Sequence, residues 1–254
     1  MNSRLKYQIF IFYPIHLGTI AGLFLAEYSL VNFLIFVLGW ILIHGYGAEL
    51  GLHRYVSHRS YIPKDIFLTP LLLFATLSIQ GPILGWASVH RYHHKHSDLK
   101  KDPHSPIQGY WYAWHSWTNR WLEYNTRKSV RSVRDLLKNK CIMFFTKNTF
   151  LVVLTTYIIV GLFDINIMFW FLMLPATLSL IQSYNVNLLC HIKQFGYRNF
   201  ETKDDSTNLK LLALTSWGLG LHNNHHKFPS ANNFERTPGE IDPAARLLLP
   251  IIKK

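Results

Sequence analysis

The sequence is short of charge and of cysteine. Charged residues make up 16% of its 254 positions, against about 25% in an ordinary soluble domain. The shortage is uneven, because no lysine or arginine occurs in residues 7–53, 65–90 and 148–191. Its two cysteines, Cys141 and Cys190, fit neither a disulfide framework nor a zinc-finger spacing. Long stretches without basic residues argue against a soluble protein and predict a membrane protein.

The basic residues that do occur give a formal net charge of +12. Such an excess can mark a protein that binds nucleic acid. Here the lysines and arginines are confined to the connections between apolar stretches, where membrane topology places them. We therefore expect the lipid bilayer, and no nucleic acid, as a partner.

Four apolar stretches are long enough to cross a bilayer, whose core of about 30 Å requires about 20 residues of helix. We expect these spans at about residues 8–26, 30–46, 148–162 and 165–185, with only a few residues between the members of each pair. The basic start leads into an apolar run that has no convincing cleavage site, which favours a retained anchor. The predicted fold is all-α: one integral membrane domain over residues 1–254, with four transmembrane helices in two hairpins.

A fifth apolar stretch, residues 66–86, contains prolines and glycines. These residues interrupt helices and favour a re-entrant or interface-lying segment over a span. The short connections at 27–29 and 163–165 hold no lysine or arginine. By the positive-inside rule, the other non-spanning parts, residues 47–65, 87–147 and 186–254, face the cytoplasm as a helical cap.

Three histidine clusters lie in or at these cytoplasmic segments. HRYVSH holds His53 and His58, HRYHH holds His90, His93 and His94, and HNNHH holds His222, His225 and His226. In the last two, the i, i+3 and i+4 spacing places all three rings on one helix face. In the first, i and i+5 lie about 140° apart on a regular helix, so the rings must straddle an ion or lie at a frayed helix end. Imidazole suits iron, copper and zinc, and the clusters together predict a dimetal site in the cap.

His191 stands alone at the end of the last apolar block, in NVNLLCH. Its spacing leaves two interpretations open, an interfacial histidine or a ninth ligand. For the other isolated histidines we expect ordinary surface or core roles: His16, His44, His96, His104 and His115.

The wider motifs resemble those of one family. GAELGLHRYVSHRSY, HRYHHKHSDLKKDPHSP and HNNHHKFP, with the apolar hairpins between them, are similar to the membrane-bound fatty acid desaturases of the Δ9 acyl-CoA/acyl-lipid (stearoyl-CoA desaturase) type over nearly the whole chain. The resemblance implies four transmembrane helices and a cytosolic cap that holds two iron ions.

The resemblance also implies a ligand for each position of the diiron centre. One iron would take His53, His58, His90, His94 and His226; the other would take His93, His191, His222 and His225, with Asn187 bound through a water. Two departures stand out: Leu219 occupies a place where the family often has an acid, and His115 has no counterpart in the common pattern. Metal-bound histidines usually donate their second N–H to a carboxylate or carbonyl. Glu49, Asp98 and Asp102 lie close to the clusters in sequence and are candidates, with a solvated surface position as the equal alternative.

The implied activity is O2-dependent desaturation, which places a cis double bond, at Δ9 in this branch, in a saturated acyl chain. The substrate would be a fatty acyl-CoA or an acyl-lipid, O2 would be the co-substrate, and a separate donor such as ferredoxin or cytochrome b5 would supply electrons. A membrane diiron hydroxylase of an alkyl, sterol or carotenoid substrate is the alternative. A metal- or heme-handling membrane protein is a third interpretation, although transport ligands should lie within the spans.

Two further stretches bear on the substrate. In GYWYAWHSWTNRW, Tyr110, Trp114, Trp117 and Trp121 would share one helical face, as an interfacial belt or as a lid over an acyl chain. Residues Arg127–Lys140 have the pattern of a basic amphipathic helix, which favours a membrane surface or an anionic group such as the CoA phosphates. A solvated cytoplasmic face is an equal alternative for the second stretch.

Overall fold

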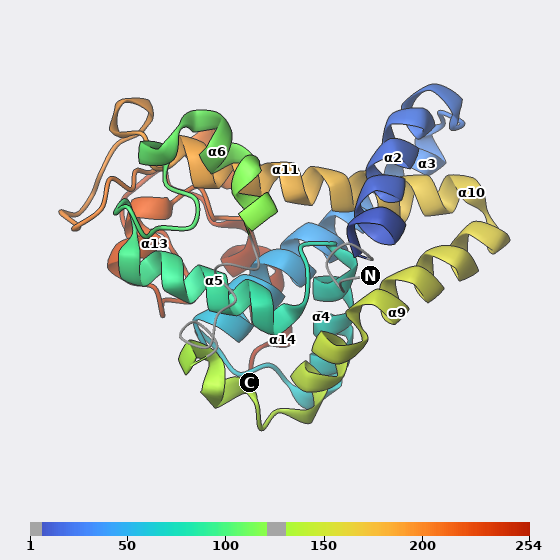
Figure 1. Cartoon of the computed structure of the whole chain (residues 1–254), viewed down its shortest axis with the longest axis horizontal. Helices are drawn as coiled ribbons and strands as arrows, with labels where there is room; N and C mark the ends of the chain where they lie inside the picture. Colours follow the sequence, from blue (N-terminus) through green and yellow to red (C-terminus); the bar gives the residue numbers. More distant parts are fainter. Residues whose placement is uncertain (1–6, 121–130) are drawn as a thin grey trace.

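The computed structural model describes residues 7–120 and 131–254, and within these ranges it is helical and contains no β-strand. The all-α prediction is therefore confirmed (Figure 1). The elements in chain order are η1 (Gln8–Phe12), α2 (Tyr13–Leu25), α3 (Leu30–Trp40), η2 (Ile41–Ser57), α4 (Asp65–Leu77), α5 (Ile83–His96), η3 (Pro106–Gln108), α6 (Tyr110–Trp114), η4 (Ser116–Arg120), η5 (Arg131–Leu136), α9 (Lys140–Phe163), α10 (Ile165–Ile167), η6 (Met168–Met173), α11 (Leu174–Leu189), η7 (Lys193–Phe195), α12 (Lys210–Thr215), α13 (His222–Lys227), η8 (Ala244–Leu248) and α14 (Leu249–Ile252).

Four continuous helices among the described residues are long and apolar enough to cross a membrane. They run over Gln8–Leu25, Leu30–Ser57, Lys140–Phe163 and Ile165–Leu189. Only residues 26–29 separate the first two, and only Asp164 separates the last two. Four spans in two hairpins are confirmed.

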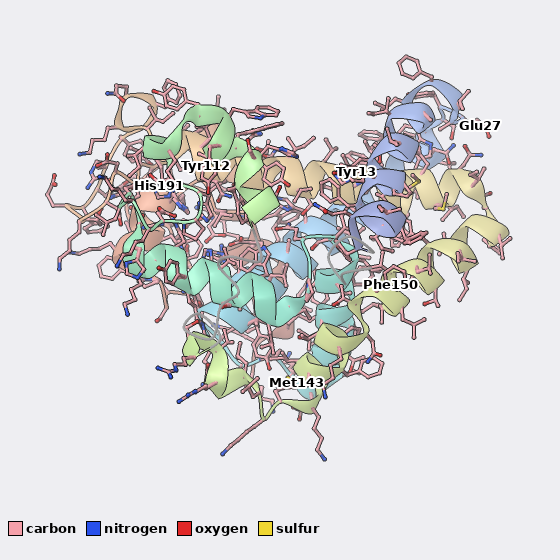
Figure 2. All side chains as sticks on the ribbon, viewed as in Figure 1. Tyr13, Glu27, Tyr112, Met143, Phe150 and His191 are labelled. Carbon is pink, nitrogen blue, oxygen red and sulfur yellow. The ribbon has the colours of Figure 1, made fainter. Side chains whose placement is uncertain are left out.

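The turns of the two hairpins are joined to each other. Ser29 and Asp164 each cap the helix that follows, by accepting backbone N–H bonds with their side chains. The backbone N–H of Glu27 donates to Asn166 at 3.0 Å, and the indole of Trp170 donates to the carbonyl of Glu27 at 3.0 Å. Glu27 therefore lies at the end of the helix bundle where both hairpins turn. Figure 2 shows it at the opposite end of the molecule from His191.

The second span does not stop at residue 46. It continues as η2 to Ser57, so the first histidine cluster is carried on the same helix as the span. This part of the helix has π geometry, in which the backbone bonds join residues five apart; π turns are frequent at functional sites. The position of His53 is thus set by the same continuous helix that forms the second span.

The apolar stretch at 66–86 divides into two helices. Its first part is α4, which holds Pro70 inside the helix and is too short to be a span. The chain turns over residues 78–82, and α5 begins at Ile83 and carries the second histidine cluster. The prolines and glycines therefore mark a break between two packed helices, because α4 lies against η2 and α9.

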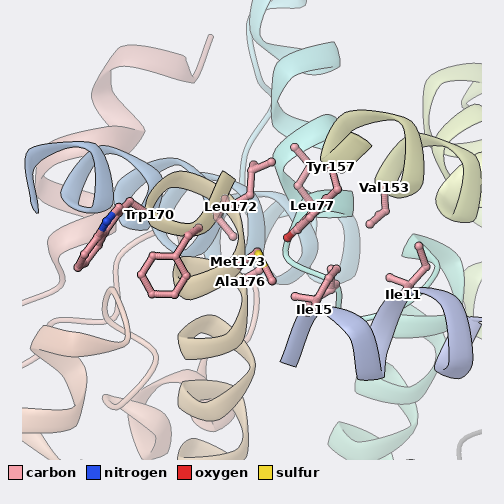
Figure 3. Close-up of a cluster of buried hydrophobic side chains, with 12 residues drawn as sticks. Ile11, Ile15, Leu77, Val153, Tyr157, Trp170, Leu172, Met173 and Ala176 are labelled. Atoms are coloured by element: carbon pink, nitrogen blue, oxygen red, sulfur yellow. The ribbon is translucent and has the colours of Figure 1, made fainter. Parts of the chain in front are cut away.

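A buried hydrophobic cluster joins the spans to α4 (Figure 3). Ile11 and Ile15 come from the first span, Leu77 from α4, Tyr157 from α9, and Leu172 from η6. All five are less than one-tenth exposed. By contrast, many large apolar side chains on the outer faces of the spans are exposed, as expected for surfaces that face lipid.

Two helix predictions in the cap are wrong. α6 ends at Trp114 and His115 leaves helical geometry with φ −139°, so the aromatic residues do not share one face; Trp121 lies outside the described residues. In the basic stretch, the described part is a short 3₁₀ turn, η5, that places Val133 in a buried core cluster and leaves Leu137 exposed. Core packing of Val133 overrides the amphipathic pattern; Arg127 to Val130 lie outside the described residues.

Close contact between η2 and α4 depends on Gly47. A Cβ atom at this position would lie 2.4 Å from the backbone carbon of Phe74, whereas at Gly51 the nearest atom would be at 3.2 Å. We expect Gly47→Ala to lower the free energy of unfolding by about 1–3 kcal/mol, the usual cost of overpacking. Gly51→Ala is the matched control and should change it far less. Thermal unfolding of the detergent-solubilised protein measures both, and equal shifts would contradict this packing.

Candidate metal centre

The three histidine clusters and His191 converge from four parts of the fold. The first cluster ends η2, the second lies on α5, and the third forms α13. His191 follows directly after the end of α11. In Figure 1 the labelled helices α5, α11 and α13 come together on the side of the molecule away from the hairpin turns.

The nine histidines form two groups. We call His53, His58, His90, His94 and His225 the five-histidine group, and His93, His191, His222 and His226 the four-histidine group. Within each group the ligand atoms lie within 4.8 Å of one another. The convergence of the three clusters on one site is therefore observed, and His191 belongs to that site.

Each HxxHH cluster contributes to both groups. On α5, His90 and His94 turn to the five-histidine group and His93 turns to the other. On α13, His222 and His226 share one group because they are four residues apart, and their Nε2 atoms are 3.1 Å apart.

The distribution implied by the resemblance is corrected at two positions. His225, expected with the four-histidine group, has its Nε2 at 3.1 Å from Nε2 of His53 and 2.9 Å from Nε2 of His94. His226, expected with the five-histidine group, lies with His222 and has its Nε2 at 3.4 Å from Nε2 of His93. The reason is helical: residues i and i+4 on α13 face one way, and residue i+3 is rotated toward η2.

The spacing of His53 and His58 is explained by the π geometry of η2. The backbone N–H of His58 donates to the carbonyl of His53 at 3.2 Å, a bond between residues five apart. This brings the two ring centroids to 4.9 Å. Residue His58 also caps the helix, so it lies at a helix end, one of the two arrangements expected from the sequence.

The donor set fits transition-metal ions. Neighbouring Nε2 atoms lie 2.7 Å apart for His58 and His90, and 3.1 Å apart for His191 and His222. Two nitrogens bound 2.1 Å from one ion at a right angle would be about 3.0 Å apart. Within the described residues, these Nε2 atoms lie mainly next to one another. A metal ion bound between them would accept their lone pairs and so explain the short distances.

Burial favours the neutral imidazole that a metal requires. It is the main cause that lowers the pKa of His58, His90, His94 and His225, and the neighbouring histidines lower it further. A neutral ring whose Nδ1 carries the proton presents an Nε2 lone pair, so these four rings are prepared for metal binding.

Four carboxylates accept from the second ring nitrogen of a histidine. Nδ1 of His53 lies 3.1 Å from a carboxylate oxygen of Glu49. The other three pairs, with their Nδ1–oxygen distances, are His93 with Asp102 (2.9 Å), His191 with Asp98 (2.8 Å) and His226 with Asp204 (2.9 Å). The three candidates taken from the sequence are among them. Asp204 was missed, because it is 22 residues from its partner and nothing local separates it from the adjacent Asp205.

The His191–Asp98 pair shows the electrostatic effect of this pairing. Burial would lower the pKa of His191, but the charge and hydrogen bond of Asp98, with the charges of Asp102 and Asp204, raise it overall. Burial would raise the pKa of Asp98, but His191 and the backbone N–H of Asp205 lower it to about 2. Asp98 is therefore ionised over the whole physiological range.

His104 was expected to have an ordinary role, but it lies directly against the site. Its ring centroid is 4.2 Å from that of His93, and its side chain is buried. The other histidines treated as ordinary, His16, His44, His96 and His115, lie in neither group. The DPH sequence that contains His104 was the only local sign of its proximity.

A cavity of about 460 Å³ lies beside the two groups. His90, His93 and His222 form part of its wall, so rings from both groups face it. Asn187, one helical turn before His191, lines it as well, and so does Leu219, which packs with Val186. Apolar and aromatic side chains supply most of the remaining wall, including Phe12, Ile79, Val89, Trp117 and Leu180.

A hydrogen-bonded cluster shapes the cavity wall next to the two histidine groups. Trp86 stacks on His90 with the ring centroids 4.9 Å apart, and its indole N–H donates to Gln80 at 2.9 Å. The amide of Gln80 donates to Ser179 at 3.2 Å, and the ring of His44 lies 2.9 Å from the same hydroxyl. The orientation of the His90 ring is thus linked, through Trp86 and Gln80, to α11 and η2.

The aromatic stretch contributes to the same cavity. His115, Trp117 and Thr118 line it, and Trp117 is buried rather than placed in an interfacial belt. The ring of His115 meets that of Tyr184 edge-on at 5.6 Å. Trp117 therefore agrees with the lid interpretation, whereas Tyr110 is 64% exposed and does not line the cavity.

Arg54 supports the five-histidine group from behind. It is fully buried, donates to Glu49 and to Asp242 at 2.9 Å each, and lies 4.1 Å above the ring of Phe234. Phe234 in turn contacts His225. No local pattern predicted the pair Arg54–Asp242, whose members are 188 residues apart.

Apolar helices of spanning length and two converging histidine groups define the class of this molecule. It is a multi-pass membrane protein with a histidine-built site suited to transition metals.

Comparison with known proteins identifies the family. The family model described as "Fatty acid desaturase" matches residues 28–236. The chain is 34% identical over 206 residues to Delta-9 acyl-lipid desaturase 2 of Arabidopsis thaliana, covering 79% of this chain and 64% of that protein. It is 30% identical over 226 residues to the sn-1 stearoyl-lipid 9-desaturase of Anabaena variabilis, covering 85% of this chain and 79% of that protein. The chain belongs to the fatty acid desaturase family, and the resemblance seen in the sequence is confirmed.

The relatives differ in length and in the substrate named for them. This chain spans 64%, 54% and 60% of three Arabidopsis relatives. A protein of Anemone leveillei, 34% identical over 191 residues, is named an acyl-CoA C20 Delta5-desaturase and is covered to 59% of its length. Family membership alone therefore does not decide between a lipid and a CoA carrier.

We expect Arg54→Leu to destabilise the protein by about 3–5 kcal/mol, because it leaves two buried carboxylates without their partner. The matched control is Arg59→Leu. Arg59 is paired with Asp135 but its side chain is 58% exposed, and loss of a surface pair costs about 1 kcal/mol or less. Thermal unfolding of the detergent-solubilised variants, together with the yield of folded protein after detergent extraction, measures both. Similar losses of stability for the two variants would contradict the structural role of Arg54.

Proposed function

We propose that this protein is an O2-dependent fatty acyl desaturase that introduces a cis double bond, at Δ9, into a saturated acyl chain. The observation that carries the proposal is the cavity walled by His90, His93 and His222, where a chain bound in the cavity would lie against both histidine groups. Family membership and the names of the relatives support the same reaction.

The centre would hold two iron ions. The five-histidine group would bind one, and the four-histidine group would bind the other, with Asn187 reaching the second through a water. When bound, iron supplies the O2 activation that removal of hydrogen from an unactivated methylene requires. Both groups contain histidine alone, and imidazole is a ligand that suits iron.

The residues of the chain itself bind, orient and shield the substrate. The apolar wall excludes water and gains free energy from burying an acyl chain. Trp86, fixed between Gln80 and His90, limits the path of the chain beside the metal ligands. Positioning of one methylene pair against the centre then follows from the shape of the wall.

We propose an acyl-lipid as the substrate rather than a soluble thioester. Tyr13 on α2 and Phe150 on α9 line the cavity, and they are 50% and 36% exposed. Both lie on spans, so the cavity would be reached from the bilayer. The acyl-lipid names of several relatives favour the same carrier.

The electrons for reduction of O2 to water would come from a separate donor, such as a ferredoxin or cytochrome b5. We place the active site on the cytoplasmic side. The basic residues between the spans support this orientation through the positive-inside rule.

Fatty-acid analysis by gas chromatography and mass spectrometry tests the reaction. Expression in a host deficient in unsaturated fatty acids should yield new monounsaturated chains, with the double-bond position assigned from derivatives. His222→Ala should abolish the product because it removes a ligand. His96→Ala, on the same side of the fold but in neither group, should retain it.

Hydroxylated products in this experiment would assign the chain to the sister hydroxylases. Absence of any product, with iron supplied and with both donor types co-expressed, would contradict the proposal.

The carrier is tested with purified protein in nanodiscs. A phospholipid that bears a stearoyl chain, placed in the same nanodisc, should be desaturated, and stearoyl-CoA added from solution should react more slowly. Phe150→Arg, which places charge at the lipid side of the cavity, should reduce conversion of the lipid substrate. Conversion of stearoyl-CoA alone would overturn the lipid assignment and leave desaturation intact.

A further inference from the structure

We propose that the two metal positions are unequal, and that the four-histidine group binds the first metal ion while the five-histidine group binds the second more weakly. This inference rests on the metal centre described under the proposed function. It concerns the hydrogen-bond partners of the ligands, which differ sharply between the groups.

In the four-histidine group, three of the four rings have an aspartate on their second nitrogen. His93 is paired with Asp102 at 2.9 Å, His191 with Asp98 at 2.8 Å, and His226 with Asp204 at 2.9 Å. All three carboxylates are mostly shielded from solvent, and the His191–Asp98 pair has side chains 1% and 6% exposed.

These aspartates are themselves held rigidly. Asp102 accepts the backbone N–H groups of Asp98 and His104, at 2.8 Å and 3.1 Å. Asp98 accepts the hydroxyl of Ser105 at 2.9 Å and the backbone N–H of Asp205 at 2.8 Å. These bonds restrain the carboxylates of Asp98 and Asp102, and with them the orientation of the His191 and His93 rings.

In the five-histidine group, His53 is the one ring paired with a carboxylate among the described residues. Its carboxylate, Glu49, also accepts from the buried guanidinium of Arg54 at 2.9 Å, which offsets the negative charge. Within the described residues, Nδ1 of His225 is buried without a hydrogen-bond partner, as is Nδ1 of His222, the one ring of the four-histidine group that lacks an aspartate. For Nδ1 of the remaining three rings, residues 7–120 and 131–254 supply no hydrogen bond.

The carboxylate pairs determine the order of affinity. A carboxylate on Nδ1 fixes the tautomer, orients the ring and makes Nε2 more basic; loss of one such partner typically costs about 10–100-fold in metal affinity. The four-histidine group has two more pairs than the other, an advantage of about 10²–10⁴-fold if the effects multiply. Its three carboxylates would also bring negative charge close to a bound ion, although the guanidinium of Arg198 donates to the backbone carbonyl of Asp204 at 3.0 Å. The fifth imidazole of the other group acts in the opposite direction but adds a single neutral ligand.

Titration with Co²⁺ tests the order directly. Full-length protein in nanodiscs is stripped of metal with a chelator and titrated, with visible absorption reporting coordination and elemental analysis reporting bound metal. The expected result is two binding steps, with the first at least about 10²-fold tighter than the second.

Two ligand variants assign the steps to the groups. His58→Ala should remove the weak step and keep the tight one, because His58 belongs to the five-histidine group. His226→Ala should remove the tight step. The reverse assignment would overturn the proposal.

Isosteric variants then test the carboxylates. Asp204→Asn should weaken the tight step about 10–100-fold and leave the weak step unchanged. Asp205→Asn is the matched control: this neighbouring side chain is 44% exposed, pairs with Lys193, and should change neither step. Asp204→Glu should recover part of the affinity, which a purely structural role would not predict. Melting temperatures of the metal-free variants confirm that each is folded.

The outcomes separate this inference from the proposed function. Two steps of equal affinity, or a tight step unaffected by Asp204→Asn, would overturn the inequality and leave the dimetal centre standing. Binding of fewer than two Co²⁺ ions by folded wild-type protein would contradict the centre itself, and the inequality with it.

Discussion

Nine imidazole nitrogens face one another at distances down to 2.7 Å in the interior of this protein. Such an arrangement is unfavourable by itself, since neutral rings meet with like lone pairs and protonated rings would repel one another. The surrounding structure must therefore hold the rings in place. Aspartates and Glu49 fix four of them through Nδ1, and the buried pair of Arg54 with Asp242 fixes the carboxylate of Glu49. Much of the polar interior serves this convergence.

The membrane-embedded helices are part of the same support. η2 continues a span directly into the first histidine cluster, and α11 ends two residues before His191. Close helix contact at Gly47 sets η2 against α4, and the turn after α4 leads to α5 and the second cluster. Apolar packing within the spans therefore fixes the positions of polar ligands outside them. The cavity lies where these helices meet, so the same elements form the cavity wall and carry the two histidine groups.

Local pattern predicted the parts that depend on local physics. The length of the apolar stretches and their lack of basic residues located the four spans. This succeeds because a single helix must itself supply enough apolar residues to cross the bilayer core. Histidine spacing located every member of both groups, including His191 once the family resemblance was considered. The failures all involve contacts between distant segments. Val133 belongs to the core and not to an amphipathic face, α6 ends at Trp114, and His225 and His226 exchange groups because the rotation of α13 against η2 decides where each ring points.

The sequence by itself determined the class of the protein: apolar stretches of these lengths predict membrane spans, and histidines at these spacings predict a metal site. Tertiary structure decided how the ligands are shared and what surrounds them. Asp204 reaches His226 across 22 residues, Arg54 reaches Asp242 across 188, and the ring of His104 packs against that of His93. Hydrogen bonds and charge pairs act over a few ångströms of space regardless of separation along the chain. Only the packed helices bring these groups within that range.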